Sequence, residues 1–491
     1  MNPLSQLKHR SPKLAALFQR KPGKEPIISV SARFQHHSGI HKSIVYCGSV
    51  GLLIAVTLLV GSWLHAAEQS KPSPNAAAEK LSENDRMISA NAQKLIEEGR
   101  QIFRFDTFGS EAFWGDTLQL HKAIAGEKNG GIGPGVSPKT ALSVGLKVDV
   151  DALPKELVAQ IKAGKVDLND PATTVALLKL DSVVGVKGIF DKNGKLASVG
   201  LRCAVCHSTV DDSFSPGIGK RLDGWANRDL NVGAIVSLAP NLKPYTDLLG
   251  VDEATLKKVL STWGPGRFDA EIDKDGKALR PDGGQAGTLI PPAFGLAGVN
   301  LHTWTGFGSV PYWNAYVGAT EMHGSGTFFD ARLADSSQYP VAAKSGAANT
   351  RGKPDMMTAK LAALHVYQLA IPAPKSPKGS FDEAMAARGK GIFEGKAKCA
   401  SCHVPPLFTE PGNNLHSPDE IGVDSFQADR SPTHMYRTAP LAGLWSHQKG
   451  GFYHDGRFGT LLDVVNHYDS VFKLQLTEQD KKELVEYLKS L

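Results

Sequence analysis

Two short motifs in the sequence combine two cysteines with a histidine in the same order and spacing. They are Cys203-Ala-Val-Cys206-His207 and Cys399-Ala-Ser-Cys402-His403. In a C-x-x-C-H motif the two thiols attach one haem covalently, and the histidine becomes an axial ligand of the iron. The two complete copies therefore predict two covalently bound c-type haems, with His207 and His403 as proximal ligands.

Other uses of paired cysteines fit the pattern less well. The pairs of a zinc ribbon lie only about 15–20 residues apart, and a thioredoxin-type pair does not need a histidine directly after it. The fifth cysteine, Cys47, lies in an apolar segment where a thiol needs no special role. Because both haems consume the remaining thiols, we expect no structural disulfide.

The first haem has no nearby downstream residue of the usual sixth-ligand types. Between Ser208 and Leu301 the chain contains neither His nor Met. The distant candidates are His302, Met322 and His323 downstream, and Met87 and His121 upstream. A five-coordinate iron, which can bind peroxide or dioxygen, is the simpler expectation. The alternative is a low-spin haem with a distant ligand.

The second haem has several candidate sixth ligands. Met435 is the only methionine after His403, and a His/Met pair of ligands is typical of electron-transfer cytochromes. Tyr468, His467 and His454 compete with it.

The N-terminal region predicts a membrane anchor. Residues 44–64 carry no charge. As a helix, this segment is long enough to cross a bilayer core of about 30 Å. Residues 1–43 hold eight Lys or Arg and one acid, so we expect them to stay cytoplasmic and the rest to be exported. A cleaved signal peptide is the competing interpretation.

The remaining chain has 47 basic and 48 acidic residues, so nothing in its charge favours nucleic-acid binding. Composition shifts then predict the organisation. We expect a mainly α-helical protein with two cytochrome c-like haem domains and extensive loops, preceded by one transmembrane helix. The predicted segments are a cytoplasmic N-terminus (1–43), an anchor (44–65), a linker (66–80), an N-terminal haem domain with insertions (81–372), a Pro-rich linker (373–379) and a C-terminal cytochrome c domain (380–491).

Local patterns predict two helices in the C-terminal domain. Phe381, Met385, Ile392 and Phe393 form an apolar stripe that leads to the second haem motif. Near the end of the chain, Thr477 can cap a helix with Glu478 and Asp480 in its first turn. Its apolar face would consist of Leu484, Tyr487, Leu488 and Leu491.

The C-terminal domain resembles the di-haem cytochrome c peroxidase and MauG family. The matching stretches are GKGIFEGKAKCASCH, YRTAPLAGLW and FYHDGRFGTLLDVVNHY. The middle of the chain resembles the family more loosely, through the first haem motif, IPPAFGLAGVNLHTWTG and YWNAYVGATEMHG. Residues 80–200 match nothing in the peroxidases.

The resemblance implies roles for particular residues. The haem at His207 would react with substrate, and the haem at His403 would feed or store electrons. Glu321 would be the distal carboxylate that shuttles a proton during O–O cleavage, although a plain surface or capping carboxylate is the alternative. Tyr468 stands where the MauG branch places a tyrosine ligand, with His467 and Met435 as alternatives. The displaceable distal histidine of the gated peroxidases is absent, which favours an always-open first haem.

Electron transfer between the haems needs a bridging aromatic residue, for which Trp225, Trp304 and Trp313 are candidates, Trp225 lying closest to the first motif. Together these features predict an oxidoreductase anchored in a bacterial inner membrane, with both haems in the periplasm. It would use peroxide or O2 and a small redox protein or a quinone-linked partner. A non-enzymatic electron carrier, and a di-haem oxygenase or cofactor-maturation enzyme, remain alternatives. Whether Ca²⁺ is bound as well is left open.

Overall fold

The computed structural model describes residues 81–491, which form one compact unit. The predicted cytoplasmic N-terminus, the membrane anchor and the first linker lie outside the described residues. Within residues 81–491, no helix is both long enough and apolar enough to cross a bilayer.

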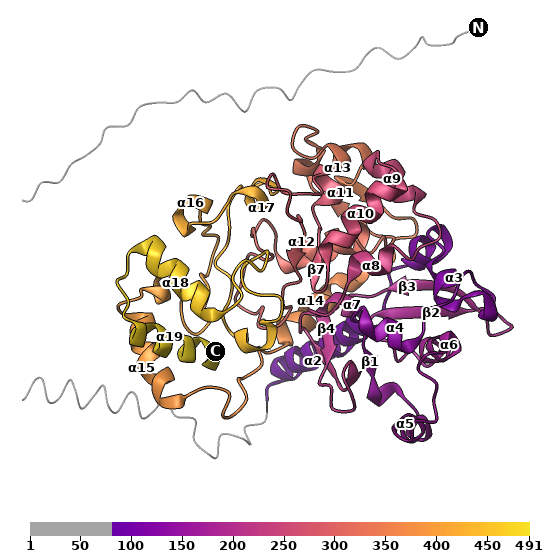
Figure 1. Ribbon diagram of the computed structural model, residues 1–491, viewed down its shortest axis with the longest axis horizontal. Coiled ribbons are helices and arrows are strands. Elements are labelled where there is room, and N and C mark those ends of the chain that lie inside the picture. The colour runs from indigo at the N-terminus through magenta and orange to yellow at the C-terminus, as the bar shows by residue number, and fades with distance from the viewer. Residues whose placement is uncertain (1–80) are drawn as a thin grey trace, which may run out of the picture. The chain divides into compact units, whose positions relative to one another are not determined.

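The described chain is mainly helical, as the sequence predicted, and many of its helices are short (Figure 1). In chain order the α-helices are α2 (Glu83–Phe105), α3 (Leu120–Ala125), α4 (Pro138–Ser143), α5 (Lys155–Lys162), α6 (Pro171–Lys179), α7 (Ala204–His207), α8 (Val232–Val236), α9 (Lys243–Leu249), α10 (Glu253–Trp263), α11 (Ile272–Asp275), α12 (Val310–Ala319), α13 (Pro340–Ser345), α14 (Leu361–Ala370), α15 (Glu383–Glu394), α16 (Pro418–Ile421), α17 (Phe426–Asp429), α18 (Leu461–Phe472) and α19 (Glu478–Ser490). Long loops join these helices, in keeping with the many Gly and Pro residues of the middle region.

The strands of the described residues pair only in twos. Four pairs are antiparallel and one is parallel: β2 (Val186–Phe190) with β3 (Leu196–Leu201), β4 (Ser208–Val210) with β6 (Arg221–Asp223), β7 (Arg267–Phe268) with β8 (Thr288–Leu289), β9 (Thr327–Phe329) with β10 (Asn349–Arg351), and, in parallel, β1 (Val148–Asp149) with β5 (Ile218–Gly219). Each of these two-stranded sheets connects neighbouring segments of the chain by backbone hydrogen bonds.

The hairpin β2–β3 delivers the chain to the first haem motif. At its turn, the Asp191 side chain accepts hydrogen bonds from the backbone N–H groups of Asn193 and Lys195. Directly after β3 comes Arg202, which is fully buried and forms an ion pair of 2.8 Å with Asp181. Residues 81–200, which resemble nothing in the peroxidases, thus fix the backbone on which the first motif stands.

Those residues also contribute to a hydrophobic core of their own. It includes Trp114, Leu118, Leu177, Val199 and Trp263, all nearly inaccessible to solvent. This core draws on helices α3, α6 and α10 and on the β2–β3 hairpin. Val205 of the first haem motif packs against this core.

Helices α15 and α19 of the C-terminal part lie side by side (Figure 1). Thr477 caps α19, as the sequence predicted, and forms a capping box with Asp480, while Asp382 caps α15. Gly389 allows their close approach, because a Cβ atom there would lie only 2.0 Å from the carbonyl oxygen of Glu483. The predicted apolar residues of α19 are buried in a core that also contacts Cys399: Leu484, Tyr487 and Leu488.

Helices α2 and α14 repeat this arrangement in the N-terminal part. A Cβ atom at Gly99 of α2 would lie 2.0 Å from the carbonyl oxygen of Ala363 in α14. The core between them contains Phe103 and Leu364, and Cys203 of the first haem motif packs against it. Each haem motif therefore adjoins a tightly packed helix pair.

Candidate haem sites and the groups around them

The first C-x-x-C-H motif forms a single helical turn, α7, that begins directly after Cys203. The Nδ1–H of His207 donates a hydrogen bond of 3.2 Å to the carbonyl oxygen of Pro291, which leaves Nε2 free for a metal. Burial lowers the pKa of His207 to about 4, so the ring is neutral at physiological pH. A neutral imidazole with an anchored Nδ1 is the form that binds iron.

The second motif presents its histidine in the same way. The Nδ1–H of His403 donates to the carbonyl oxygen of Phe408 at 3.0 Å, and burial lowers the pKa of this histidine as well. The first cysteine of the motif, Cys399, begins a short 3₁₀ turn.

The cysteines fit covalent haem better than a thiolate metal site. All four in the described residues are free thiols. Burial raises the pKa of Cys203 and Cys206 to about 12 and that of Cys399 to about 11, so a thiolate at these positions would be costly to bury. Zinc needs thiolates, whereas a thioether to haem carries no charge that must be buried. These residues therefore fit two c-type haems.

Glu321, predicted as the distal carboxylate, lies in the turn that follows α12. The indole N–H of Trp114 fixes this turn by donating to the carbonyl oxygen of Met322 at 3.0 Å. Glu321 is half-buried, and its Oε1 atom is inaccessible to solvent and has no hydrogen-bond partner among the described residues. Burial raises its pKa well above the usual value, and the charge of nearby Asp273 raises it further. The negative charge of Glu321 in turn contributes to the raised pKa of Cys206 in the first motif.

Aromatic residues surround this turn. The His323 ring stacks on Phe113 with ring centroids 3.5 Å apart, and its Nε2 lies 3.4 Å from the hydroxyl oxygen of Tyr245. Met322 packs in the core beside Phe103 and Leu364. Both side chains adjacent to Glu321 thus have packing roles.

The other distant ligand candidates for the first haem are engaged elsewhere or exposed. His302 Nε2 donates to the carbonyl oxygen of Val299 in its own loop, and His121 Nδ1 donates to that of Gly115. Met87 lies on α2 with 60% of its surface exposed. Each histidine keeps one ring nitrogen free, so open coordination of the first haem stays a prediction.

Around the second motif, Tyr468 of α18 has the most suitable surroundings among the predicted ligands. Burial raises its pKa, and a hydrogen bond with Tyr453 acts in the opposite direction. Its ring lies 6.1 Å from that of Tyr453, a second buried tyrosine that the sequence reasoning missed. Tyr453 directly precedes the HDG turn, but no spacing rule singles it out.

The alternatives to Tyr468 differ in availability. The Nε2–H of His467 donates to the carbonyl oxygen of Ile421 at 2.9 Å. His454 stacks on Tyr436, and its Nε2 is buried without a hydrogen-bond partner among the described residues. Met435 is half-buried. His467 is thus the least available of the three as an iron ligand, because its Nε2 is already used in a hydrogen bond.

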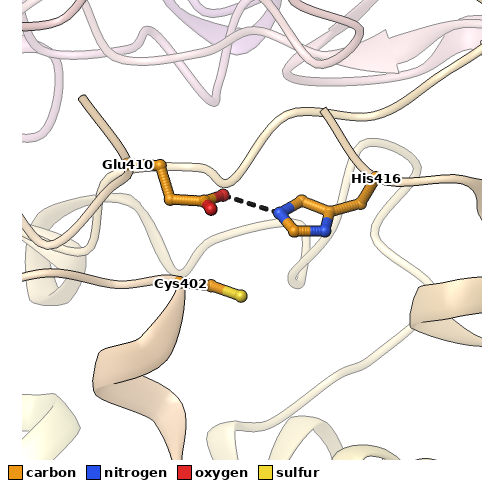
Figure 2. Close-up of side chains that lie close together, drawn as sticks. All are labelled: Cys402, Glu410 and His416. Atoms are coloured by element: carbon orange, nitrogen blue, oxygen red, sulfur yellow. Dashed lines mark hydrogen bonds and ion pairs between the residues drawn. The ribbon is translucent and has the colours of Figure 1, made fainter. Parts of the chain in front are cut away.

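A histidine between two carboxylates adjoins the second motif, and Figure 2 shows it with one of them, Glu410, and with Cys402. His416 Nε2 lies 2.6 Å from Glu410, and its Nδ1 lies 2.8 Å from Glu420. Burial lowers the pKa of His416, but its bonds to the two carboxylates outweigh this and raise it. Cys402 lies within 4.8 Å of this group. Because Cys402 belongs to the haem motif, we interpret His416 and its carboxylate partners as charged groups that line the haem site.

Of the three predicted relay residues, Trp225 makes aromatic contacts with the C-terminal part, whereas Trp304 contacts it through its backbone, where its carbonyl oxygen accepts a hydrogen bond from the Arg437 N–H. The ring of Trp225 meets that of Trp445 edge to face at 5.4 Å, and that of Phe294 at 6.4 Å. Trp313 instead packs among Phe307, Tyr312 and Tyr316, and the Trp304 N–H donates to the carbonyl oxygen of Leu289. The sequence reasoning missed Trp445, although it ends the family-like stretch YRTAPLAGLW.

Comparisons with known proteins agree with the family resemblance. The chain is 31% identical over 125 residues to the methylamine utilization protein MauG of Methylorubrum extorquens, covering 22% of this chain and 35% of that protein. This chain thus matches about a third of the length of its curated relative. No family model matches the chain.

Two solved structures are also similar over part of the chain. Hydrazine synthase of Kuenenia stuttgartiensis aligns with 23% identity over 43% of this chain and 75% of its own, with a TM-score of 0.25. A MauG-like protein associated with microbial copper homeostasis aligns with 16% identity over 47% of this chain and 78% of its own, with a TM-score of 0.30.

Proposed function

Starting from a chain that is similar to MauG, we propose that this protein is a di-haem oxidoreductase of the cytochrome c peroxidase and MauG type. The observation that carries the proposal is Glu321, a carboxyl group whose Oε1 atom is buried and has no hydrogen-bond partner among the described residues, and whose charge acts on Cys206 of the first haem motif. A carboxyl group with a raised pKa can both accept and donate a proton at neutral pH. That capacity is what the cleavage of a bound peroxide requires.

The two sites would divide the work. Haem bound at the first motif supplies an iron centre that binds peroxide or dioxygen, and haem at the second motif supplies a reservoir of electrons. The protein residues position and protonate: His207 and His403 would bind the two irons through Nε2, and Glu321 would move a proton at the substrate. Tyr468 would be the sixth ligand at the second motif.

We further propose that the chain is anchored by residues 44–65 in a bacterial inner membrane and faces the periplasm. A small redox protein or a quinone-linked carrier would exchange electrons with it. Membrane fractionation and alkaline extraction test the anchor, and the haem-stained protein should stay with the membrane. A variant in which a cleavable export signal replaces residues 1–65 should instead be released from the membrane.

The test of the activity is spectroscopic. EPR and optical spectra of the haem-loaded protein, ferric and ferrous, should show one high-spin ferric haem that changes on addition of peroxide. Glu321→Gln should lower the rate of that change by about 10²- to 10⁴-fold, the usual contribution of general acid–base catalysis. Its haem content and resting spectra should equal those of the unaltered protein.

Two low-spin haems that peroxide leaves unchanged would contradict this proposal. The protein would then be an electron carrier. In that case the contact between Trp225 and Trp445 would serve only to pass electrons. Glu127→Gln, at an exposed glutamate in the N-terminal part, is the matched control and should react at the full rate.

A further inference from the structure

Arg228 is a buried arginine that pairs with no carboxylate in residues 81–491. Only 6% of its surface is exposed. Its Nη1–H donates to the backbone carbonyl oxygen of Lys449 at 3.2 Å, whereas its Nε is inaccessible to solvent and has no hydrogen-bond partner among the described residues. Burial lowers its pKa to about 10. Because a buried guanidinium without a negative partner is costly, this position favours the binding of an anion.

A second arginine, Arg267, contacts the same loop of the C-terminal part. Its Nη2–H donates to the carbonyl oxygens of Gly450 and Asp455, at 3.4 and 3.3 Å. Its Nε is likewise inaccessible and without a partner among the described residues. Because Lys449 and Gly450 are consecutive, both guanidinium groups contact the same short stretch of this loop. In agreement, the charge of Arg267 contributes to the lowered pKa of Arg228.

The acidic residues beside these two arginines already have cationic partners. Asp229, which directly follows the first arginine, pairs with Lys147 at 2.6 Å and also with Lys449. Asp455 offers the second arginine only its backbone carbonyl, since its carboxylate pairs with Arg457 at 2.7 Å. Within the described part of the chain, the two guanidinium groups thus have backbone carbonyls as acceptors but no carboxylate.

Both arginines follow residues that are tied to the first haem motif. The backbone N–H of Asn227, which precedes the first arginine, donates to the carbonyl oxygen of Cys206 at 2.8 Å. The carbonyl oxygen of Gly266, which precedes the second, accepts a hydrogen bond of 2.9 Å from the N–H of Ile290. Cys206 packs against the apolar cluster that contains Ile290, and the next residue, Pro291, accepts the hydrogen bond from the histidine of the motif. The two arginines are therefore held beside the first motif.

We propose that Arg228 and Arg267 bind a propionate carboxylate of the haem that is attached at the first motif. A haem brings its propionates into the protein, and a buried carboxylate needs a counter-charge as much as a buried guanidinium does. Arginine suits this partner because its planar fork matches the two oxygens of a carboxylate. The inference rests on the haem assignment within the proposed function, but not on any reaction with peroxide.

Resonance Raman spectra of the ferric holoprotein test this contact without turnover, because the propionate bending band responds to hydrogen bonds at the carboxylate. Arg228→Gln removes both the charge and the Nε–H group. It should shift the band in difference spectra against the unaltered protein, in which the contribution of the second haem cancels. Arg267→Gln should shift the same band in the same direction, and Arg228→Lys, which keeps the charge but lacks the fork, should shift it as well.

The midpoint potential of the first haem gives a second readout. A positive charge beside the haem disfavours the ferric iron, which carries the higher positive charge. Arg228→Gln should therefore favour the ferric form at least tenfold, which lowers the potential by about 59 mV for a one-electron couple. Arg228→Lys should change the potential much less, because the charge remains.

Arg351→Gln is the matched control for the loss of an arginine. Arg351 is exposed, lies in the same part of the chain, and donates to the backbone carbonyls of Phe328 and Thr350. Its replacement should alter neither the propionate band nor the potential. If Arg228→Gln does not fold, Arg267→Gln and Arg228→Lys still test the contact through the band.

Two results would overturn the inference. A lower potential with an unshifted band in all three variants would mean that the arginines act only through their charge. A small free anion between the arginines would be revealed by sodium chloride or inorganic phosphate. The potential of the unaltered protein would then follow the concentration of the salt, and that of Arg228→Gln would not.

The haem content separates this inference from the proposed function. A protein without haem at the first motif, as measured by the pyridine haemochrome assay, would reject both. Two bound haems with an unshifted propionate band in the variants would reject the arginine contact alone. A shifted band in a protein that is inert to peroxide would retain the contact and reject the proposed function.

Discussion

At the scale of single residues, the contact between Trp225 and Trp445 leads to a prediction about electron transfer. Trp225→Phe or Trp445→Phe should slow electron exchange between the haems severalfold, because phenylalanine is harder to oxidise and fills less of the gap. Flash reduction followed by optical spectroscopy measures the rate. Trp263→Phe is the control, since Trp263 is buried in the core of the N-terminal part and its ring contacts Phe268. Equal rates in all three variants would remove the tryptophan pair from the electron route.

Residue patterns in the sequence predicted the local chemistry but not what surrounds it. The haem motifs were predictable because five consecutive residues contain all the attachment groups. Glu321 emerged only through a family resemblance, and the charge that Asp273 contributes near it did not emerge at all. The signal for Asp273 was an acid at every second position from Asp269 to Asp275, which the sequence analysis did not use. Two other acids of this run, Asp269 and Asp275, pair with Arg430, a residue far along the chain. Spacing in the sequence alone could not reveal that arrangement.

At the scale of elements, the α15–α19 pair makes a prediction about two glycines of one helix. Gly389→Ala should destabilise the protein by about 1–3 kcal/mol, the usual cost of overpacking, because its Cβ would collide with the backbone of α19. Gly391→Ala should instead stabilise it by about 0.5–1 kcal/mol, since nothing lies within 4 Å of a Cβ there. Urea unfolding followed by circular dichroism measures both. Similar effects of the two substitutions would contradict the close approach of the helices.

Elements with strong local signals were predictable, and elements that depend on tertiary contacts were not. Helix α19 was expected from Thr477 and the apolar spacing, and the structure confirms the cap and the buried face. Three residues of the predicted apolar stripe, Met385, Ile392 and Phe393, lie in α15, whereas Phe381 precedes the cap of this helix. The short strands and the one-turn helices carry too few residues for a period to show, so packing around the haem motifs decides them.

At the scale of the whole molecule, Arg430 joins the C-terminal part to the acidic loop of the N-terminal part. Arg430→Ala should cost about 3–5 kcal/mol of unfolding free energy, because it leaves buried carboxylates without their counter-charge. Arg388→Ala, which removes a half-exposed partner of Glu483, should cost less than about 1 kcal/mol. Thermal unfolding of both variants is the measurement. A small effect at Arg430 would mean that the two parts are held together mainly by other contacts.

The late position of Arg430 in the sequence has a consequence for how the protein folds during synthesis. Arg430 follows its partner Asp275 by 155 residues, so the acidic loop leaves the ribosome long before its counter-charge exists. Until then the loop carries several like charges that oppose their own burial. We therefore expect the N-terminal part, expressed alone, to stay loosely folded and to be degraded, while co-expression with residues 373–491 as a separate polypeptide rescues it. The order of synthesis would thereby leave Cys203 and Cys206 accessible during the interval in which a haem must be attached to them.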